Sequence, residues 1–184
     1  MARSQSTDPL LSFRFHVDAT GVNGEQKLAT PGRTQAGFST CTIPSPSNAV
    51  VTYKEGNMVY ERKYPGLPTY ADITLSRGVI RGETMFWDWI LQVIEGSGEY
   101  RAQIDIKHFH RDTSLLGVEP TRPAGTPNFT QLNFDNPART YQLFEAFPTT
   151  HKISSDLGAT SGEISMTELG VGFEYANILE GPVP

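Results

Sequence analysis

Residues 100–109 read YRAQIDIKHF, and this stretch decides the fold class. Its apolar residues Tyr100, Ala102, Ile104 and Ile106 alternate with polar or charged ones. Because successive side chains of a β-strand point to opposite faces of the sheet, this period of two predicts a strand with one buried face. At about 3.3 Å per residue, the strand would span about 33 Å. We therefore expect a protein built mainly from β-strands.

Shorter stretches with the same alternation occur on both sides of this segment. The expected strands are residues 11–17, 38–43, 50–54, 71–76, 140–146 and 163–175. Glycine and proline supply 17 and 13 residues and stand between these stretches, which is typical of strands joined by turns. The prolines of residues 44–48 should break the chain there and prevent pairing between the strands on either side. The apolar phase shifts between Met166 and Leu169, which predicts a β-bulge or kink.

One helix is expected, from about Thr84 to Glu95. Thr84 is a suitable N-cap, and Gly96 stands where a residue in the left-handed conformation ends many helices. Its apolar side chains have the spacing of one helix face: Phe86, Trp89, Ile90 and Val93. We interpret this stripe as core packing rather than as a ligand platform.

Charged residues are few, and acidic ones predominate. Lys and Arg number 15 and Asp and Glu number 20, so the net charge is 15 − 20 = −5, and 19% of the residues are charged. Average domains have about 25%, so the shortfall indicates a large interior or a surface that partners cover. The basic residues are dispersed, which argues against nucleic-acid binding. No apolar run approaches the roughly 20 residues of a membrane-spanning helix.

The composition shows no break between domains, so we expect one domain over residues 1–184. Within it we expect a flexible N-terminus at 1–9, an extended loop or insertion at 111–138 and a C-terminal tail at 176–184. Residues 1–9 lack the apolar core of a signal peptide. The single cysteine, Cys41, excludes an internal disulfide and favours folding in a reducing compartment.

The sequence contains no recognisable catalytic or cofactor motif. A nucleophile elbow, phosphate-binding loops and the His-Glu-x-x-His zinc motif are absent. His108 and His110 have the spacing that places two histidines on one side of a strand, with Asp112 as a third metal ligand, but Arg111 would oppose a cation. We therefore expect no metal, no cofactor and no catalysis. A hydrolase with an unrecognised carboxylate pair stays open as an alternative.

Several segments, taken in their order along the chain, resemble the tail tube proteins of contractile phages and the inner-tube proteins of contractile injection systems. The resembling segments are LSFRFHVD at 11–18, AGFS at 36–39, YKEG at 53–56, RKYPGLPTY at 62–70, ITLSRG at 73–78, FWDWI at 86–90 and EAFP at 145–148. The run from 62 to 78 is the most specific of them. Phe147 stands where the family commonly has tryptophan.

The resemblance implies a structural protein, an antiparallel β-sandwich or barrel with one flanking helix. Copies of it would close into hexameric rings that stack into a hollow tube, which a contracting sheath drives through a target envelope. The implied partners are further copies of the chain, the contractile sheath protein, baseplate and spike proteins, and a tape-measure or cargo protein in the lumen. No specific nucleic-acid binding is implied, and the target membrane is met only by puncture. The implied location is the bacterial cytoplasm during assembly, then a virion tail or an extracellular or cell-associated injection particle.

Two properties of the residues agree with such a tube. The long strands expected at 100–109 and 163–175 would leave exposed edges in a monomer, and ring closure pairs such edges with neighbouring subunits. A lumen without basic clusters would also let DNA or an acidic cargo pass without holding it.

Candidate ring-stacking residues lie where proline stiffens a turn or glycine frees one. They are Tyr53, Glu55, Gly56, Lys63, Tyr64, Pro65 and Gly66. The first three belong to the segment 53–58, and the last four form an expected turn. The alternative is that both segments are hairpin loops without a special role. For the whole chain, the alternative is a stand-alone β-sandwich module that binds carbohydrate through Tyr60, Tyr64 and Tyr70.

Overall fold

The computed structural model describes residues 9–25, 27–28, 37–96, 99–109, 137–158 and 162–181. Its strands are β1 (Phe15–Gly21), β2 (Thr40–Cys41), β3 (Ser45–Tyr53), β4 (Arg62–Ala71), β5 (Ile73–Gly78), β6 (Ala102–His108), β7 (Arg139–Lys152), β8 (Met166–Gly172) and β9 (Tyr175–Glu180). Within these residues there is one helix, α1 (Met85–Ile94). The predicted fold class, mainly β with one helix, is confirmed. Residues 1–8 and 111–136, which belong to the expected N-terminus and loop, lie outside the described residues.

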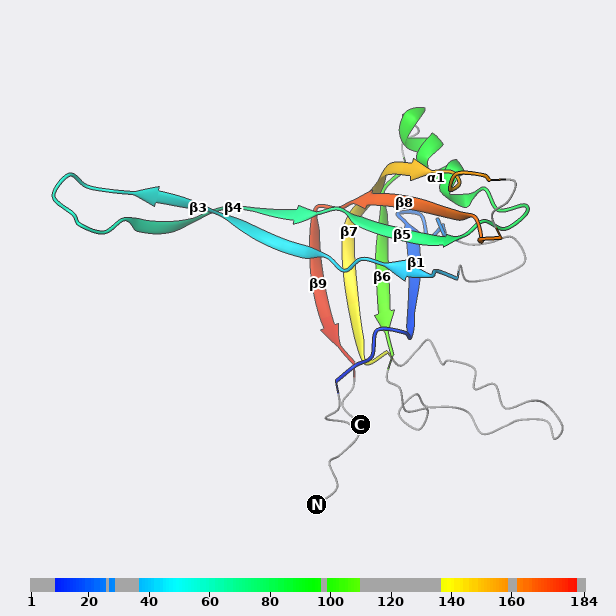
Figure 1. The fold of residues 1–184 in the computed structure, drawn as a ribbon, viewed down its shortest axis with the longest axis horizontal. Helices are drawn as coiled ribbons and strands as arrows, with labels where there is room; N and C mark the ends of the chain where they lie inside the picture. The colour runs from blue at the N-terminus through cyan, green and yellow to red at the C-terminus, as the bar shows by residue number, and fades with distance from the viewer. Residues whose placement is uncertain are drawn as a thin grey trace, which may run out of the picture.

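Two antiparallel sheets share one long strand. Sheet A contains β1, β6, β9 and the first part of β7, and sheet B contains β2, β5, β8 and the second part of β7. β7 pairs with β6 as far as Ala146 and with β8 from Phe147 onward. Near this change of sheet the register with β6 shifts, and Glu145 has a φ of 55°. Such a bulge bends a strand, and in Figure 1 the strands of the two sheets cross one another.

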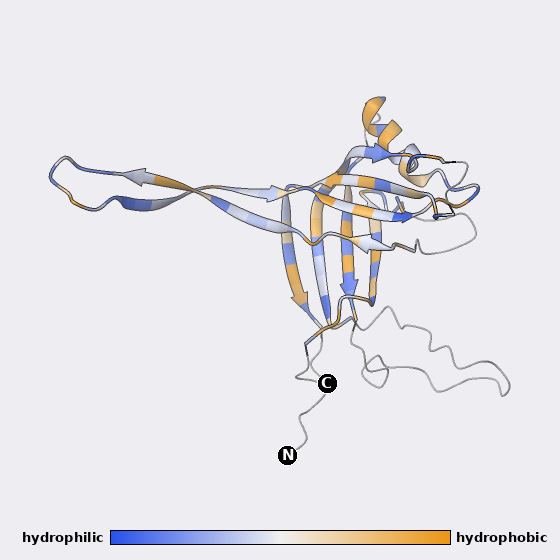
Figure 2. Cartoon of the chain, in the orientation of Figure 1, coloured by the Kyte–Doolittle hydropathy of each residue, from blue (hydrophilic) through white to orange (hydrophobic). Residues whose placement is uncertain are grey.

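The hydrophobic core lies between the two sheets. The inward side chains that are at most 1% exposed come from both: Val17, Ala19, Ile104, Ile106 and Leu143 from sheet A, and Ile73, Leu75, Leu169 and Val171 from sheet B. Figure 2 shows the matching alternation of hydrophobic and hydrophilic residues along the strands. Removing this apolar surface from water stabilises the fold by about 25 cal/mol per Å².

α1 covers one end of this core. Phe86 and Trp89 are buried, whereas Ile90 and Val93 of the predicted stripe are partly buried. The indole N–H of Trp89 donates a hydrogen bond to the carbonyl oxygen of Tyr100 at 2.7 Å. This bond satisfies the polar atom of a side chain that is otherwise in apolar surroundings.

The two ends of α1 differ in how they are fixed. The hydroxyl of Thr84 donates to the carboxylate of Asp88 at 2.7 Å instead of capping a backbone N–H. Gly96 has a φ of 67°, as expected of a left-handed residue after a helix. Arg77 of β5, which is 4% exposed, forms an ion pair with Glu83 just before the helix. No helix in the described part of the chain is long and apolar enough to cross a membrane.

Two predicted boundaries around prolines are wrong. Residues 44–48 are mostly strand, since β3 begins at Ser45. Lys63 to Gly66 belong to β4 rather than to a turn, and the hairpin turns beyond Tyr53. β2 and β3 do not pair with each other, as predicted, because β2 pairs with β5 and β3 with β4. In a two-stranded hairpin each strand has an unpaired side, where the missing N–H of proline costs no ladder hydrogen bond.

The C-terminal part also differs from the prediction. The expected strand 163–175 is two strands, because β8 ends at Gly172 and Tyr175 begins β9. Residues 176–180 of the expected tail therefore belong to a sheet. The predicted bulge between Met166 and Leu169 is absent, since β8 pairs with β5 there in continuous register. The bulge was predicted because Ile164 and Met166 were counted as one apolar phase. Ile164 is 78% exposed and does not belong to the core face.

Candidate assembly surfaces

The hairpin formed by β3 and β4, residues 45–71, is the arm of the molecule. It projects far from the two sheets (Figure 1). Every residue of β3 and most residues of β4 are exposed. Among the described residues, β3 and β4 pair with each other alone. Because a single two-stranded hairpin is at best marginally stable in water, the arm is suited to packing against another molecule.

The arm brings all the predicted ring-stacking residues together. Tyr53 ends β3, Glu55 and Gly56 lie in the distal loop, and Lys63, Tyr64, Pro65 and Gly66 lie on β4. In the paired part, Tyr64 lies opposite Val51 and Lys63 lies opposite Thr52. The predicted set therefore occupies the distal half of one element, instead of two separate loops.

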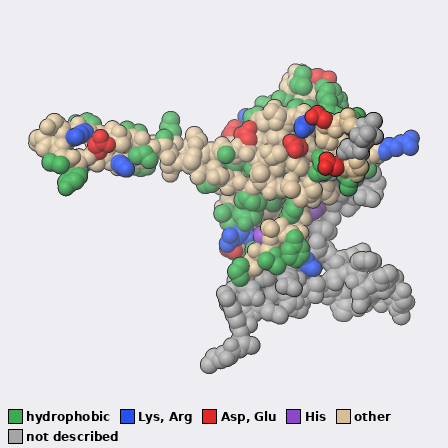
Figure 3. All heavy atoms as spheres, in the orientation of Figure 1, with side chains coloured by type: hydrophobic (Ala, Val, Ile, Leu, Met, Phe, Trp, Pro, Cys, Tyr) green, Lys and Arg blue, Asp and Glu red, His purple; other side chains and the backbone are tan. Residues whose placement is uncertain are grey.

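The predicted ring-stacking set did not include the three most exposed apolar side chains of the arm. Val59, Tyr60 and Leu67 are 82%, 83% and 80% exposed. Figure 3 shows hydrophobic side chains along the arm, with a cluster near its tip. The sequence feature that could have indicated an exposed strand here is the run AVVTY at residues 49–53. These residues have high β propensity, but two prolines precede them and suggest a break in the strand. Exposed apolar side chains gathered on one element indicate an interaction surface.

Prolines limit how a partner can contact the arm. Pro46 lies on β3, and Pro65 and Pro68 lie on β4. Since proline has no N–H to donate to a further strand, both edges are protected against pairing. The prolines therefore favour side-chain contacts over strand pairing as a way of packing against the arm. Gly66 has another role, because a Cβ there would lie 2.9 Å from the carbonyl oxygen of Ala49, so it permits the close approach of the two strands.

The arm also differs in charge from the rest of the chain. It contains three basic residues, Lys54, Arg62 and Lys63, and two acidic ones, Glu55 and Glu61, so its net charge is 3 − 2 = +1. The remaining residues therefore have a net charge of −5 − 1 = −6. Opposite charges of this kind favour contact between the arm and the body of a second copy.

Sheet A has two open edges. Among the described strands, β1 pairs only with β6 and β9 only with β7. The edge of β1 is occupied at its C-terminal end, where Lys27 N–H donates to the carbonyl oxygen of Ala19 at 2.9 Å and Gly21 N–H donates to that of Glu25 at 2.7 Å, so its open part is the N-terminal half. All neighbours in this sheet are antiparallel, so β1 and β9 run in opposite directions. A second copy in the same orientation can therefore place its β1 beside β9 as an antiparallel neighbour. The expectation that 100–109 and 163–175 supply the edges is wrong, because β6 and β8 each pair on both sides.

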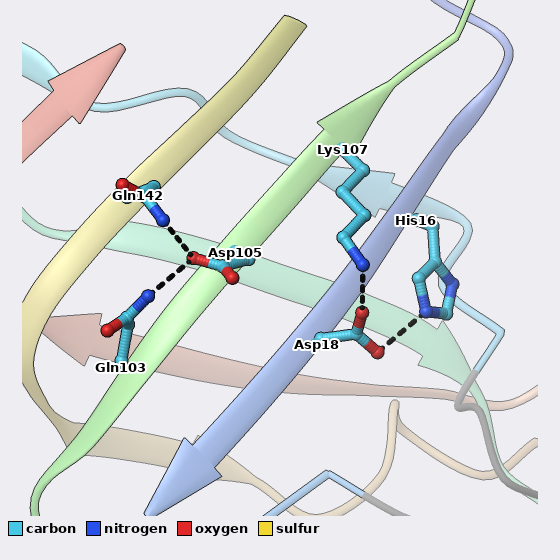
Figure 4. A network of polar contacts seen from close by, with 6 residues as sticks. All are labelled: His16, Asp18, Gln103, Asp105, Lys107 and Gln142. Carbon is cyan, nitrogen blue, oxygen red and sulfur yellow. Dashed lines mark hydrogen bonds and ion pairs between the residues drawn. The ribbon is translucent and has the colours of Figure 1, made fainter. Parts of the chain in front are cut away.

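The face of sheet A that points away from sheet B is polar, and its central side chains form the polar face: His16, Asp18, Gln103, Asp105, Lys107 and Gln142. Figure 4 shows these side chains on one side of β1, β6 and β7. The ammonium group of Lys107 donates to Asp18 Oδ2 at 3.0 Å, and Asp18 Oδ1 lies 2.7 Å from His16 Nε2. The side-chain amides of Gln103 and Gln142 both donate to Asp105 Oδ1, at 3.0 and 3.3 Å.

These contacts determine the ionisation of Asp18. Burial acts to raise the pKa of Asp18, but the hydrogen bonds and charges of His16 and Lys107 outweigh it and hold the pKa below its ordinary value. Asp18 is therefore a carboxylate at neutral pH, and it forms an ion pair with Lys107.

Of the residues considered for chemistry, the structure describes Cys41 and His108, and both bond to backbone carbonyl oxygens. Cys41 and His108 line one cavity of about 390 Å³ between β2 and sheet A. The thiol of Cys41, however, donates to the carbonyl oxygen of Thr42 at 3.4 Å, and burial raises its pKa to about 12. His108 Nε2 lies 2.8 Å from the carbonyl oxygen of Leu11. His110 to Asp112 lie outside the described residues, and the described part contains no cluster of metal-binding side chains.

Structures of known proteins share this fold. The chain is similar to a protein of the 6-fold symmetrised anti-feeding prophage baseplate, with a TM-score of 0.68 and 18% identity over 95% of this chain and 97% of that one. It is also similar to a protein of the sheath–tube complex of an extracellular contractile injection system, PVC, with a TM-score of 0.68 and 22% identity over 96% and 95%. A third similar structure is a chain of the PVC sheath/tube terminator in the extended state. Its TM-score is 0.65 and its sequence identity is 23%, over 94% of this chain and 97% of that one.

The family of the chain follows from its sequence. A comparison with curated protein sequences gives no significant match. The sequence profile of the T4-like virus tail tube protein gp19, in contrast, matches residues 11–177, which is most of the chain. The matched range includes every strand of sheet B, the arm, α1 and nearly all of sheet A. The chain therefore belongs to the family of T4-like virus tail tube proteins.

Proposed function

We propose that the chain is the inner-tube subunit of a contractile tail or contractile injection system, and that it acts mechanically rather than as an enzyme. The observation that carries this proposal is the pair of open edges of sheet A, which run in opposite directions on the same subunit. One copy can use both edges at once, each with a different neighbour. Membership in the tail tube family supports the same assignment.

Ring closure follows from repeating one contact. β9 of one copy pairs with β1 of the next, and a head-to-tail contact repeated around an axis closes a ring. Sheet B and α1 lie on the core side of sheet A. Because these two elements take up more room than sheet A alone, they form the outer layer of the ring, where the circumference is larger. The polar face of sheet A then points toward the channel. A ring of six copies is supported by the 6-fold symmetry of the similar baseplate structure.

The arm makes the second contact. It extends past the body of its own subunit and carries exposed apolar and basic side chains, so it reaches the acidic body of a neighbouring copy. We assign the stacking of rings to its distal half, with Tyr53, Glu55 and Gly56 in the loop and Lys63 to Gly66 on β4. Pairing within a ring and arm contacts between rings together produce a hollow tube.

The remaining partners are those that a tube requires. The similar proteins were solved in a baseplate, a sheath–tube complex and a terminator, which supports contacts of this tube with a sheath and a baseplate. We assign a spike to its tip and DNA or a protein cargo to its lumen. Subunits assemble in the bacterial cytoplasm and function in a virion tail or an extracellular injection particle.

A stand-alone carbohydrate-binding module has no support from the matched family or from the similar structures. The tyrosines considered for it are also not a common platform. The ring of Tyr70 packs against that of Phe173 with centroids 5.4 Å apart, whereas Tyr60 lies in the distal loop of the arm.

Electron microscopy of the purified chain tests the proposal directly. We expect rings, or tubes of one diameter, in negative stain at high protein concentration. Mass photometry of the same sample should show a species of six subunits. Isolated particles of the monomer mass at every concentration and ionic strength would contradict the proposal.

A further inference from the structure

Two carboxylates on the polar face lie next to each other and are each compensated by neighbouring side chains. Asp18 of β1 lies directly opposite Asp105 of β6 in the register of the two strands. Like charges in such a position are destabilising unless other groups compensate them. Here Lys107 compensates Asp18, and the two glutamine amides hold Asp105.

Lys107 is the one lysine or arginine that the strands of sheet A present on this face. The outward positions are 16, 18 and 20 on β1, 103, 105 and 107 on β6, 140, 142 and 144 on β7, and 175, 177 and 179 on β9. Of these, Lys107 is the one lysine and Asp18 and Asp105 are acidic, so with His16 counted as neutral the net charge per subunit is 1 − 2 = −1. The ammonium group of Lys107 is engaged by Asp18 at 3.0 Å.

We infer that Asp18 masks Lys107, so that the channel wall does not retain a nucleic-acid strand, and that Asp18 is the residue that determines this property. The inference rests on the proposed function, because it needs the polar face to line a channel. Phosphates bind proteins chiefly through Lys and Arg, and the released counterions supply much of the affinity. A lysine that already has a carboxylate partner on its own subunit releases few counterions.

The repetition of the subunit makes this masking important. In a tube the same lysine recurs around every ring and in every stacked ring, so a strand in the channel would meet many copies at once. Individually weak contacts multiply in such an array. An unmasked lysine at this position would therefore hold a passing strand along its whole length.

A graded series of variants tests the inference in assembled tubes. Asp18→Asn changes the wall from −1 to 0 per subunit, Asp18→Asn with Asp105→Asn changes it to +1, and adding Lys107→Gln returns it to 0 without a lysine. Glu168→Gln, an exposed change on β8 of sheet B, is the matched control for loss of a carboxylate elsewhere. Each sample is first imaged, so that tube formation is scored separately from retention.

The probe is a fluorescent single-stranded oligonucleotide mixed with the subunits during assembly and measured after sedimentation of the tubes. We expect background retention in the native protein and in Glu168→Gln, and about tenfold or more in the double variant at about 50 mM salt. Retention should disappear at about 500 mM salt and in the triple variant. The retained strand should resist a nuclease that is too large to enter the channel.

Two results would overturn the inference while leaving the tube itself established. One is a double variant that forms tubes but retains no more oligonucleotide than the native protein. The other is a triple variant that retains as much as the double variant, since the lysine would then not be the cause. If the double variant does not assemble, Lys107→Gln serves instead. Its unmasked Asp18 should make tubes retain a fluorescent oligolysine more strongly, and unchanged retention would equally reject the masking.

Discussion

At the scale of single residues, Asp18 shows how a sheet can tolerate two carboxylates side by side. Its pKa is depressed by His16 and Lys107 despite partial burial, so the folded state binds its proton less readily than the unfolded state does. The unfolded pKa is about 3.9. The stability that Asp18 contributes is therefore fully present above about pH 4 and is lost as the pH falls through the folded pKa.

The pH dependence of this stabilisation can be measured by comparing the native chain with Asp18→Asn. Unfolding by urea at a series of pH values should show the native chain more stable by about 1 kcal/mol at pH 7, because a charge-assisted hydrogen bond is lost in the variant. The difference should shrink as the pH falls below about 4. A difference that grows at acid pH would show that the Asp18 contacts do not act as described.

Cys41 is a second residue whose pKa differs from its ordinary value. Burial raises the pKa of the Cys41 thiol to about 12, so the thiol stays protonated at neutral pH. We expect iodoacetamide to modify Cys41 far more slowly in the folded chain than in urea, where the pKa returns to about 8.5. Equal rates in the two states would contradict the packing of Cys41 against the core.

At the scale of elements, the arm is the feature whose role is easiest to isolate. Leu67 on the arm and Leu157 on the body have nearly the same exposure, 80% and 86%. Leu67→Glu should therefore reduce tube formation strongly, whereas Leu157→Glu should leave it nearly unchanged. Sedimentation of assembled tubes measures both effects.

Thermal unfolding provides the control for this comparison. Both leucines make few contacts in the monomer, so the two variants should unfold within a few degrees of the native chain, as surface substitutions usually do. If the two variants assemble equally well, the arm is not an assembly surface. Gly66→Asp is less suitable for this test, since Gly66 lies against the backbone of Ala49 inside the arm.

The elements also show what the sequence could and could not predict. β6 and α1 were predictable because each has a complete apolar period facing one core, and Gly96 marks the end of α1. The arm was not, because its apolar residues face no core of their own and its prolines indicate breaks. β9 was missed for a similar reason: Tyr175, Ile178 and Leu179 are about half exposed, so no buried face shaped that part of the sequence.

At the scale of the whole molecule, the low share of charged residues corresponds to surfaces that a second copy would cover. These are the arm and the open edges of β1 and β9. The role of the ring-stacking set stays a prediction, which its two glycines and one proline suggested because these residues point to an unusual backbone. Which strands form the edges was not, because strand order depends on contacts between distant parts of the chain.

The proposed pairing of β9 with the next subunit can be tested by removing one backbone N–H group from β9. Gly181 N–H bonds to the carbonyl of Ala138, so in the alternating antiparallel ladder the N–H of Ile178 points away from β7, and it is bonded to the Asn177 side chain. Ile178→Pro should therefore block the pairing of β9 with the next subunit and abolish rings. Ile178→Ala, which keeps the N–H, should retain them.

Mass photometry distinguishes these outcomes, and circular dichroism checks that the proline variant is folded. Proline on an edge strand costs no bond to β7 at this position. Rings that form equally well with Ile178→Pro would mean that subunits do not join through β9.

The passage of β7 from one sheet into the other has a mechanical consequence. A tube that is pushed from its outside and resisted at its tip experiences shear between its inner wall and its outer layer. Packed side chains alone would resist such sliding only through weak, short-range forces. Because β7 is one continuous chain in both layers, part of this load passes through covalent bonds, and the two layers of each subunit must move as one piece.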